Sequence, residues 1–144
     1  VILQAMVERP SLVPGYKTPG SAGLDLATKE RACLKRGEMR MVGTGVRVAI
    51  PEGHVGLVFS RSSTATKMRV TLANKVGVVD SDYRGEIMLP LVYEGEDEFA
   101  CIEAGTRVAQ LVIVPYARVR VELVDELDDT KRGEGGFGST GEGA

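Results

Sequence analysis

Hydrophobic and polar positions change along this chain with the short period that is typical of β-strands. Five segments are either continuously apolar or alternate between apolar and polar side chains, and each is bounded by turn-forming residues. They cover residues 46–50, 55–59, 86–93, 108–114 and 119–124. The pattern therefore predicts a protein built mainly from short strands.

Turn signals separate these segments at intervals of about 8–12 residues, the spacing of all-β sandwiches and barrels. Residues 46–50 and 55–59 flank a Pro-Glu-Gly turn and are expected to form a hairpin. One short helix is expected at 62–68. The chain has no room for the crossover helices of a parallel sheet, so we predict an all-β sandwich or barrel of the jelly-roll type, built from antiparallel strands.

The last fourteen residues differ in kind from the rest of the chain. Residues 131–144 hold six of the 18 glycines, and Phe137 is their only large apolar side chain. Such a segment buries too little surface to offset its ordering entropy, so we expect a β domain over 1–130 and a flexible Gly-rich tail over 131–144. An aromatic ring among glycines also suits a lid over a nucleotide, with the ring on the base and backbone amides on the phosphates.

Composition narrows the classes of function. The net charge of −2 argues against a basic nucleic-acid-binding face, and His54, Cys33 and Cys101 are too few for a His/Cys zinc site. His54 lies in a turn, which disfavours a histidine-dependent hydrolase. Two widely separated cysteines predict reduced thiols in an intracellular, cytoplasmic protein. No apolar run approaches the ~18 residues of a membrane span, so no membrane association is expected.

Two further segments carry candidate chemistry. Residues 60–64 read Ser-Arg-Ser-Ser-Thr directly after an apolar strand, which suits either an anion site or a helix N-cap. Asp80 follows an apolar pair and precedes a turn, so it could act as a general base on water or simply serve the turn. Neither motif alone decides between its two interpretations.

Taken together and in order, these segments resemble the five motifs of the homotrimeric deoxyuridine triphosphatase (dUTPase) family. The matching segments are residues 22–26, 61–63, 74–85, 105–111 and 132–141, which span nearly the whole chain. The third and fifth are the most specific of the five. One departure is Ser63, which stands where the family usually has glycine.

The resemblance implies an all-β fold, a distorted jelly-roll or β-clip barrel. It also implies hydrolysis of dUTP to dUMP and pyrophosphate, which keeps uracil out of DNA and supplies dUMP for thymidylate synthesis. Asp80 would deprotonate the water that attacks the α-phosphorus. Mg²⁺ would bind the triphosphate, with Asp25 near it through water. The partners implied are dUTP and further copies of the chain, in a homotrimer whose sites lie between subunits and whose tails reach a neighbour's site.

The resemblance also assigns the substrate contacts. Tyr83 would pack on the deoxyribose and exclude a 2′-hydroxyl. The uracil would contact Asn74, the backbone of Gly77, Val78 and Val79, and the region of Met88. The triphosphate would contact Arg61, Ser62, Ser63 and Gln110. The residues expected to close over the bound nucleotide are Arg132, Phe137, Gly138, Ser139 and Thr140.

Three rival interpretations stay open at this stage. A dCTP deaminase shares the fold, but its family places a catalytic glutamate roughly where this chain has Pro90. A dUTPase-like module that senses nucleotide or docks a regulator would bind without turnover. A jelly-roll structural protein would have no affinity for nucleotides.

Overall fold

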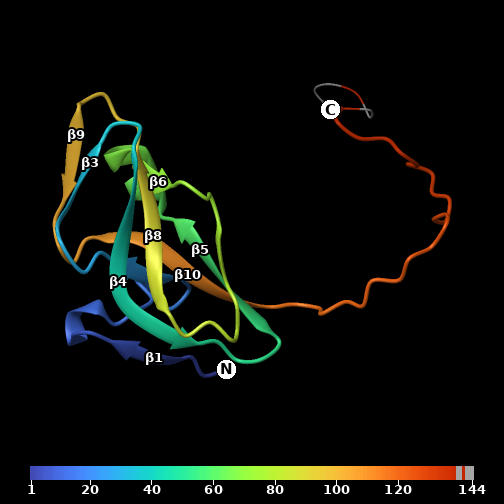
Figure 1. Cartoon of the computed structure of the whole chain (residues 1–144), viewed down its shortest axis with the longest axis horizontal. Coiled ribbons are helices and arrows are strands. Elements are labelled where there is room, and N and C mark those ends of the chain that lie inside the picture. Colours follow the sequence, from blue (N-terminus) through green and yellow to red (C-terminus); the bar gives the residue numbers. More distant parts are fainter. Residues whose placement is uncertain (139–140, 142–144) are drawn as a thin grey trace.

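The chain folds into two four-stranded antiparallel sheets and one two-stranded sheet, as the computed structural model of residues 1–138 and 141 shows (Figure 1). The first sheet has the strand order β1-β4-β8-β6, and the second has the order β2-β10-β5-β7. Strands β3 and β9 form the small sheet. The all-β, jelly-roll-like expectation is confirmed, although the sheets in the described residues stay separate rather than closing into one barrel.

The strands are short, as the alternation predicts. Their bounds are β1 Gln4–Val7, β2 Leu24–Ala27, β3 Ala32–Lys35, β4 Met39–Ala49, β5 His54–Ser60, β6 Val70–Leu72, β7 Gly77–Val79, β8 Glu86–Tyr93, β9 Phe99–Ile102 and β10 Arg107–Pro115. A 3-10 turn covers Pro10–Leu12. The predicted helix at 62–68 appears as a short π-helical segment, Thr64–Met68. No helix in the described part of the chain is long and apolar enough to cross a membrane.

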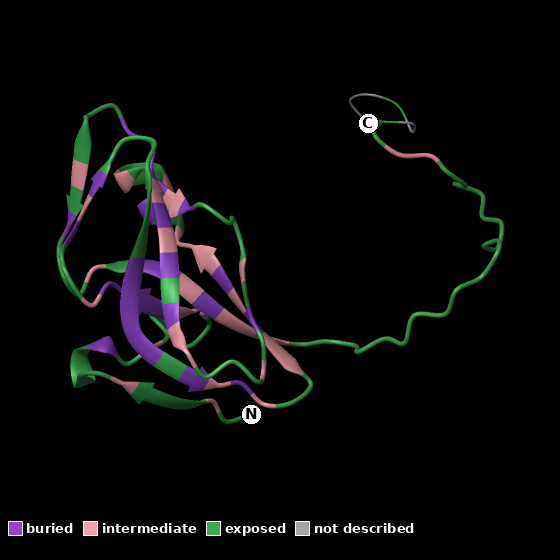
Figure 2. Ribbon diagram, viewed as in Figure 1, coloured by how far each residue is buried: buried purple, intermediate pink, exposed green. Residues whose placement is uncertain are grey.

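The core lies between the two large sheets and follows from the period of two. In β8, Ile87, Leu89 and Leu91 are buried, whereas the alternate residue Met88 is exposed (Figure 2). Leu111 of β10 is also fully buried, from the opposite sheet. Each strand of this kind therefore contributes one apolar face to the core and turns the other outward.

The expected hairpin between residues 46–50 and 55–59 is wrong. Strand β4 pairs with β1 and β8, whereas β5 pairs with β10 and β7, so the two segments belong to different sheets. The turn after Ile50 carries the chain from one sheet to the other. Local alternation identifies strands but carries no information on which strand each one pairs with.

The predicted strand at 119–124 is also wrong for this chain taken alone. Strand β10 ends at Pro115, and residues 116–138 leave the sheets without further strand or helix (Figure 1). Val119, Val121 and Leu123 are 76%, 79% and 93% exposed. A strand needs a hydrogen-bonding neighbour, and the described residues of this chain place none beside this segment.

The expectation of two reduced thiols is wrong as well. Strands β3 and β9 pair antiparallel with Cys33 directly opposite Cys101, and the two sulfur atoms form a disulfide across 68 residues of sequence. Cross-strand partners lie close enough for this bond, with a Cα–Cα distance of 4.0 Å here. The sequence did not predict this disulfide, because the two cysteines are distant in sequence and only the strand register brings them together.

We predict that removing the disulfide lowers stability. A Cys33→Ser/Cys101→Ser variant should lose about 2–4 kcal/mol in free energy of unfolding, because the bond restricts the unfolded chain. Denaturant unfolding of the oxidised protein, with and without a thiol reductant, measures this. Reduced wild type should match the double variant, and identical unfolding curves in both conditions would contradict the prediction.

Candidate active site

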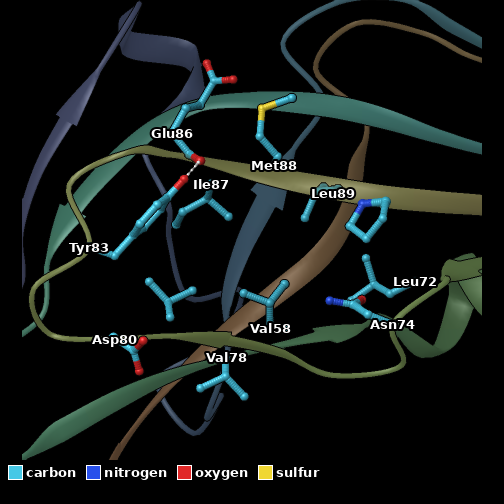
Figure 3. A pocket seen from close by; sticks show the side chains of 13 residues that line it. Val58, Leu72, Asn74, Val78, Asp80, Tyr83, Glu86, Ile87, Met88 and Leu89 are labelled. Atoms are coloured by element: carbon cyan, nitrogen blue, oxygen red, sulfur yellow. Dashed lines mark hydrogen bonds between the residues drawn. The ribbon is translucent and has the colours of Figure 1, made fainter.

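A narrow cavity of about 230 Å³ lies between β7 and β8 (Figure 3). It follows from the pairing of these strands, because β7 hydrogen-bonds to β5 of the second sheet and β8 to β4 and β6 of the first. Two strands of one sheet would lie ~4.8 Å apart and leave no space between them. The lining residues are Val58, Leu72, Asn74, Gly77, Val78, Val79, Asp80, Tyr83, Glu86, Ile87, Met88, Leu89 and Pro90.

The cavity is mostly apolar and carries a few polar groups at its edge. Asn74 lies at one end and Asp80 and Tyr83 at the other (Figure 3). At Gly77 a Cβ atom would lie only 3.2 Å from the Cβ of Val58, so glycine lets the backbone approach the cavity floor. A thin apolar slot with a small number of polar groups suits a planar heterocycle.

Tyr83 is held by a hydrogen bond within its own turn. Its hydroxyl donates to the backbone carbonyl of Glu86 at 2.8 Å, and its amide donates to the carbonyl of Asp80 at 3.2 Å. Figure 3 shows the ring at the mouth of the cavity, beside the start of β8. The orientation of the ring therefore depends on the backbone position of Glu86.

A second cluster of predicted residues lies on the other large sheet. Asp25 of β2 forms an ion pair with Arg61, with 3.0 Å between Oδ1 and Nε. Gln110 of β10 is the register partner of Asp25, and its Nε2 donates to the carbonyl of Ser60 at 3.1 Å. Arg61 and Asp25 line a separate cavity with Gly15, Tyr16, Lys17 and Arg107, which shares no residue with the first.

Ser62 and Ser63 are exposed at the start of the short helix. The side chain of Ser63, the departure from the family motif, makes no capping hydrogen bond. Its hydroxyl is thus not used as a helix cap.

None of the described tail residues lines either cavity. Arg132 Nε donates to the carbonyl of Gly135 at 2.7 Å, and Phe137 is fully exposed. Gly138 has a φ of +86°, while Ser139 and Thr140 lie outside the described residues. One chain therefore assembles two groups of predicted site residues and leaves the tail away from both.

The expected metal ion would have few protein ligands. The described residues contain no group of three or more His, Cys, Asp or Glu side chains that could hold a metal. Asp25 is a single carboxylate, only 7% exposed, beside the guanidinium of Arg61. This donor set fits Mg²⁺, which is commonly held by one or two carboxylates together with substrate phosphates and water.

Sequence reasoning missed a charged network behind the first cavity. Lys29 Nζ contacts Glu86 Oε1 at 2.7 Å and Glu8 Oε1 at 3.1 Å. The hydrogen bonds to Glu86 and Glu8 raise the pKa of Lys29, and the hydrogen bond from Lys29 lowers the pKa of Glu8. The three residues lie far apart in sequence, and the only local signal was the position of Glu86 directly after the Arg84–Gly85 turn.

Comparison with known proteins identifies the family of the chain. The dUTPase family model matches residues 9–141. A deoxyuridine 5′-triphosphate nucleotidohydrolase of Cutibacterium acnes is 47% identical over 132 residues, which cover 92% of this chain and 87% of that protein.

Solved structures resemble the fold closely. The Staphylococcus bacteriophage 80alpha dUTPase with dUPNHPP is 30% identical, with a TM-score of 0.89 over 97% of this chain and 98% of that one. A variant dUTPase of phage phi11 of S. aureus, described for its coordination of a structural Mg(II) ion, is 25% identical with a TM-score of 0.80, over 88% and 98%. Because the family model and a relative at 47% identity both extend over nearly the whole chain, this protein belongs to the dUTPase family.

Proposed function

We propose that this chain hydrolyses dUTP to dUMP and pyrophosphate. The observation that carries the proposal is the narrow cavity between β7 and β8, with Asn74, Asp80 and Tyr83 at its edge, in a chain of the dUTPase family. The uracil ring enters this cavity and meets the Asn74 side chain and the backbone of Gly77, Val78 and Val79.

The walls of the cavity account for selectivity. We expect Met88 and the backbone at Gly77 to leave no space for the 5-methyl group of thymine, because both line this narrow cavity. Tyr83 packs against the sugar, where a 2′-hydroxyl would collide with the ring. A site built this closely rejects a substrate carrying an extra group because nothing can move aside without strain.

Asp80 acts as the general base. Its exposed carboxylate follows β7 at the mouth of the cavity, beside the sugar end of the bound nucleoside. It accepts a proton from water as the water oxygen bonds to the α-phosphorus. The bond between the α-phosphorus and the oxygen that bridges it to the β-phosphorus breaks, and pyrophosphate leaves. Such a reaction needs positioning and charge neutralisation more than covalent catalysis, which suits a site without histidine or cysteine.

Cationic and backbone groups hold the triphosphate. Arg61, Ser62, Ser63 and Gln110 contact its oxygens, and Arg132, Phe137 and Gly138 of the tail cover the bound nucleotide. Mg²⁺ held by the phosphates, and by Asp25 through water, would neutralise charge that develops on the triphosphate oxygens. The tail, residues 131–144, thus belongs to the site, whereas residues 1–130 form the domain that carries it.

We infer that the working form is a homotrimer with sites between subunits. The two cavities of one chain share no lining residue, and the tail lies away from both, so a complete site requires neighbouring copies. The outer face of the β4–β8 pair is apolar, with Met41 opposite Pro90 and Met39 opposite Val92. The alternating segment 119–124 gains a strand partner only on another copy.

A pyrophosphate-release assay across dUTP, dCTP, dTTP and UTP tests the reaction. We expect turnover of dUTP and at most weak turnover of the other three, without ammonia from dCTP, because Pro90 cannot move the proton that deamination needs. Ammonia release would favour the deaminase. Nucleotide binding without turnover would favour a sensing module, and the absence of binding would favour a structural protein.

An Asp80→Asn variant tests the general base. It should still bind dUTP, because the cavity is unchanged, while pyrophosphate release falls at least about 10²-fold. Asp82→Asn is the matched control, since Asp82 is exposed in the same turn but does not line the nucleoside cavity. Unchanged turnover by Asp80→Asn would remove Asp80 from the mechanism.

Light scattering coupled to size exclusion tests the assembly. The wild type should have three times the 15.4 kDa mass of one chain. Val121→Asp/Leu123→Asp should weaken the trimer and lower dUTP turnover with it, because charges replace apolar side chains on the alternating segment 119–124. Glu122→Gln, on the alternate face, should change neither, and a monomeric, fully active wild type would overturn the inference.

A further inference from the structure

Lys29 joins two parts of the molecule that are distant in sequence. It follows β2, and its ammonium group contacts the carboxylates of both Glu8, next to β1, and Glu86, the first residue of β8. The lysine side chain is 25% exposed, and that of Glu86 only 15%. The backbone of Lys29 is held as well, since its amide donates to the Gly43 carbonyl at 3.0 Å and its carbonyl accepts from Arg9.

The path of the Lys29 side chain depends on a missing Cβ atom at Gly43. A Cβ at that position would lie 2.6 Å from both Lys29 Cε and Glu86 Oε2. Gly43 does not have a positive φ, so its backbone alone does not demand glycine. The glycine instead provides the space in which the ion pair forms.

Lys29 is the cation that contacts the Glu86 carboxylate in the described structure. Arg47 is the register partner of Glu86, but its Nη1 donates to the Arg84 carbonyl at 3.1 Å. Without Lys29, the largely buried carboxylate of Glu86 would have no contacting counterion. A buried carboxylate without a counterion either moves toward water or destabilises the folded state, because its desolvation is no longer offset.

The two ends of Glu86 serve different groups. In Figure 3 its carboxylate points away from the nucleoside cavity, while its backbone carbonyl accepts the hydrogen bond from the Tyr83 hydroxyl. The carboxylate contacts Lys29 Nζ at 2.7 Å. A shift of Glu86 that reaches its backbone at the start of β8 would displace the acceptor that orients the Tyr83 ring.

We propose that Lys29 is a positioning residue for the sugar side of the nucleoside pocket: by anchoring Glu86 over Gly43, it fixes the carbonyl that orients Tyr83 and so sets the preference for a deoxyribose. This inference rests on the proposed function for the role of Tyr83. Lys29 does not line the cavity and acts only through Glu86.

The first test is Lys29→Met, which keeps a long unbranched side chain and removes its charge. The kcat/KM ratio of dUTP to UTP should fall at least about tenfold, the lower end of the effect of removing groups that orient metal ligands. Lys35→Met is the matched control, because Lys35 forms only an exposed ion pair with Glu38 at 3.9 Å and should keep the wild-type ratio. Lys29→Arg should recover much of the ratio by keeping the charge.

A second variant approaches the same network from Gly43. In Gly43→Ala the new methyl group displaces the ends of the Lys29 and Glu86 side chains, which should lower the dUTP-to-UTP ratio in the same direction. Gly20→Ala is its control, since a Cβ there meets no atom within 4 Å. A merely structural role would lower the melting temperature of Lys29→Met and Gly43→Ala while leaving the ratio unchanged, and that result would overturn the proposal.

Hydrogen exchange separates this inference from the proposed function. In the ligand-free protein, Lys29→Met should speed amide exchange in residues 81–86 relative to Lys35→Met, whatever the substrate is. A wild type that turns over dUTP, with identical exchange and an unchanged ratio in Lys29→Met, overturns only the inference. A wild type without dUTP turnover contradicts the proposed function, and the exchange measurement still decides whether Lys29 holds the turn.

Discussion

The division of the β7 and β8 backbone hydrogen bonds between two sheets is the constraint on which the site depends. Adjacent strands in sequence usually pair with each other, but here β7 pairs with β5 and β8 with β4 and β6. Strand β8 is paired on both sides, whereas β7 is the edge strand of its sheet and pairs on one side only, which leaves its outer amides and carbonyls for water or a ligand. This gap is the cavity, and buried core residues between the two sheets form its inner wall.

This arrangement makes the site rigid where selectivity is needed. The lower walls are core residues such as Val58 and Leu89, which cannot move without disturbing the packing between the sheets. The upper edge is a turn, and it depends on local polar contacts instead. Tyr83 is tied to Glu86, and Glu86 is tied to Lys29, so a short chain of hydrogen bonds gives the turn a support that apolar packing does not supply.

One chain exposes many large apolar side chains on its surface. Met39 and Met41 are about half exposed on the outer face of β4, and the segment after Pro115 exposes an alternating apolar face. Exposed apolar patches of this kind mark surfaces that bind other protein. In the homotrimer that we propose, a short chain would build its triphosphate site from parts that no single copy brings together.

The sequence by itself determined the strands, their turns and the identity of most candidate site residues, because alternation and turn chemistry are local properties. The five motifs were sufficient to indicate the family. Strand partners were not predictable: the expected 46–50/55–59 hairpin is absent, and the 119–124 segment has no partner within the described chain. Pairing depends on contacts between residues distant in sequence, which a local pattern does not contain.

The same reason explains what only the tertiary structure decided. The disulfide between Cys33 and Cys101 follows from the β3–β9 register, and the Lys29 ion pairs from the meeting of β1, β2 and β8 beside Gly43. Neither has a spacing that marks it in the sequence. The residues that do the proposed chemistry were therefore readable from local motifs, whereas the residues that hold them in place became visible only once the sheets had set the distances between them.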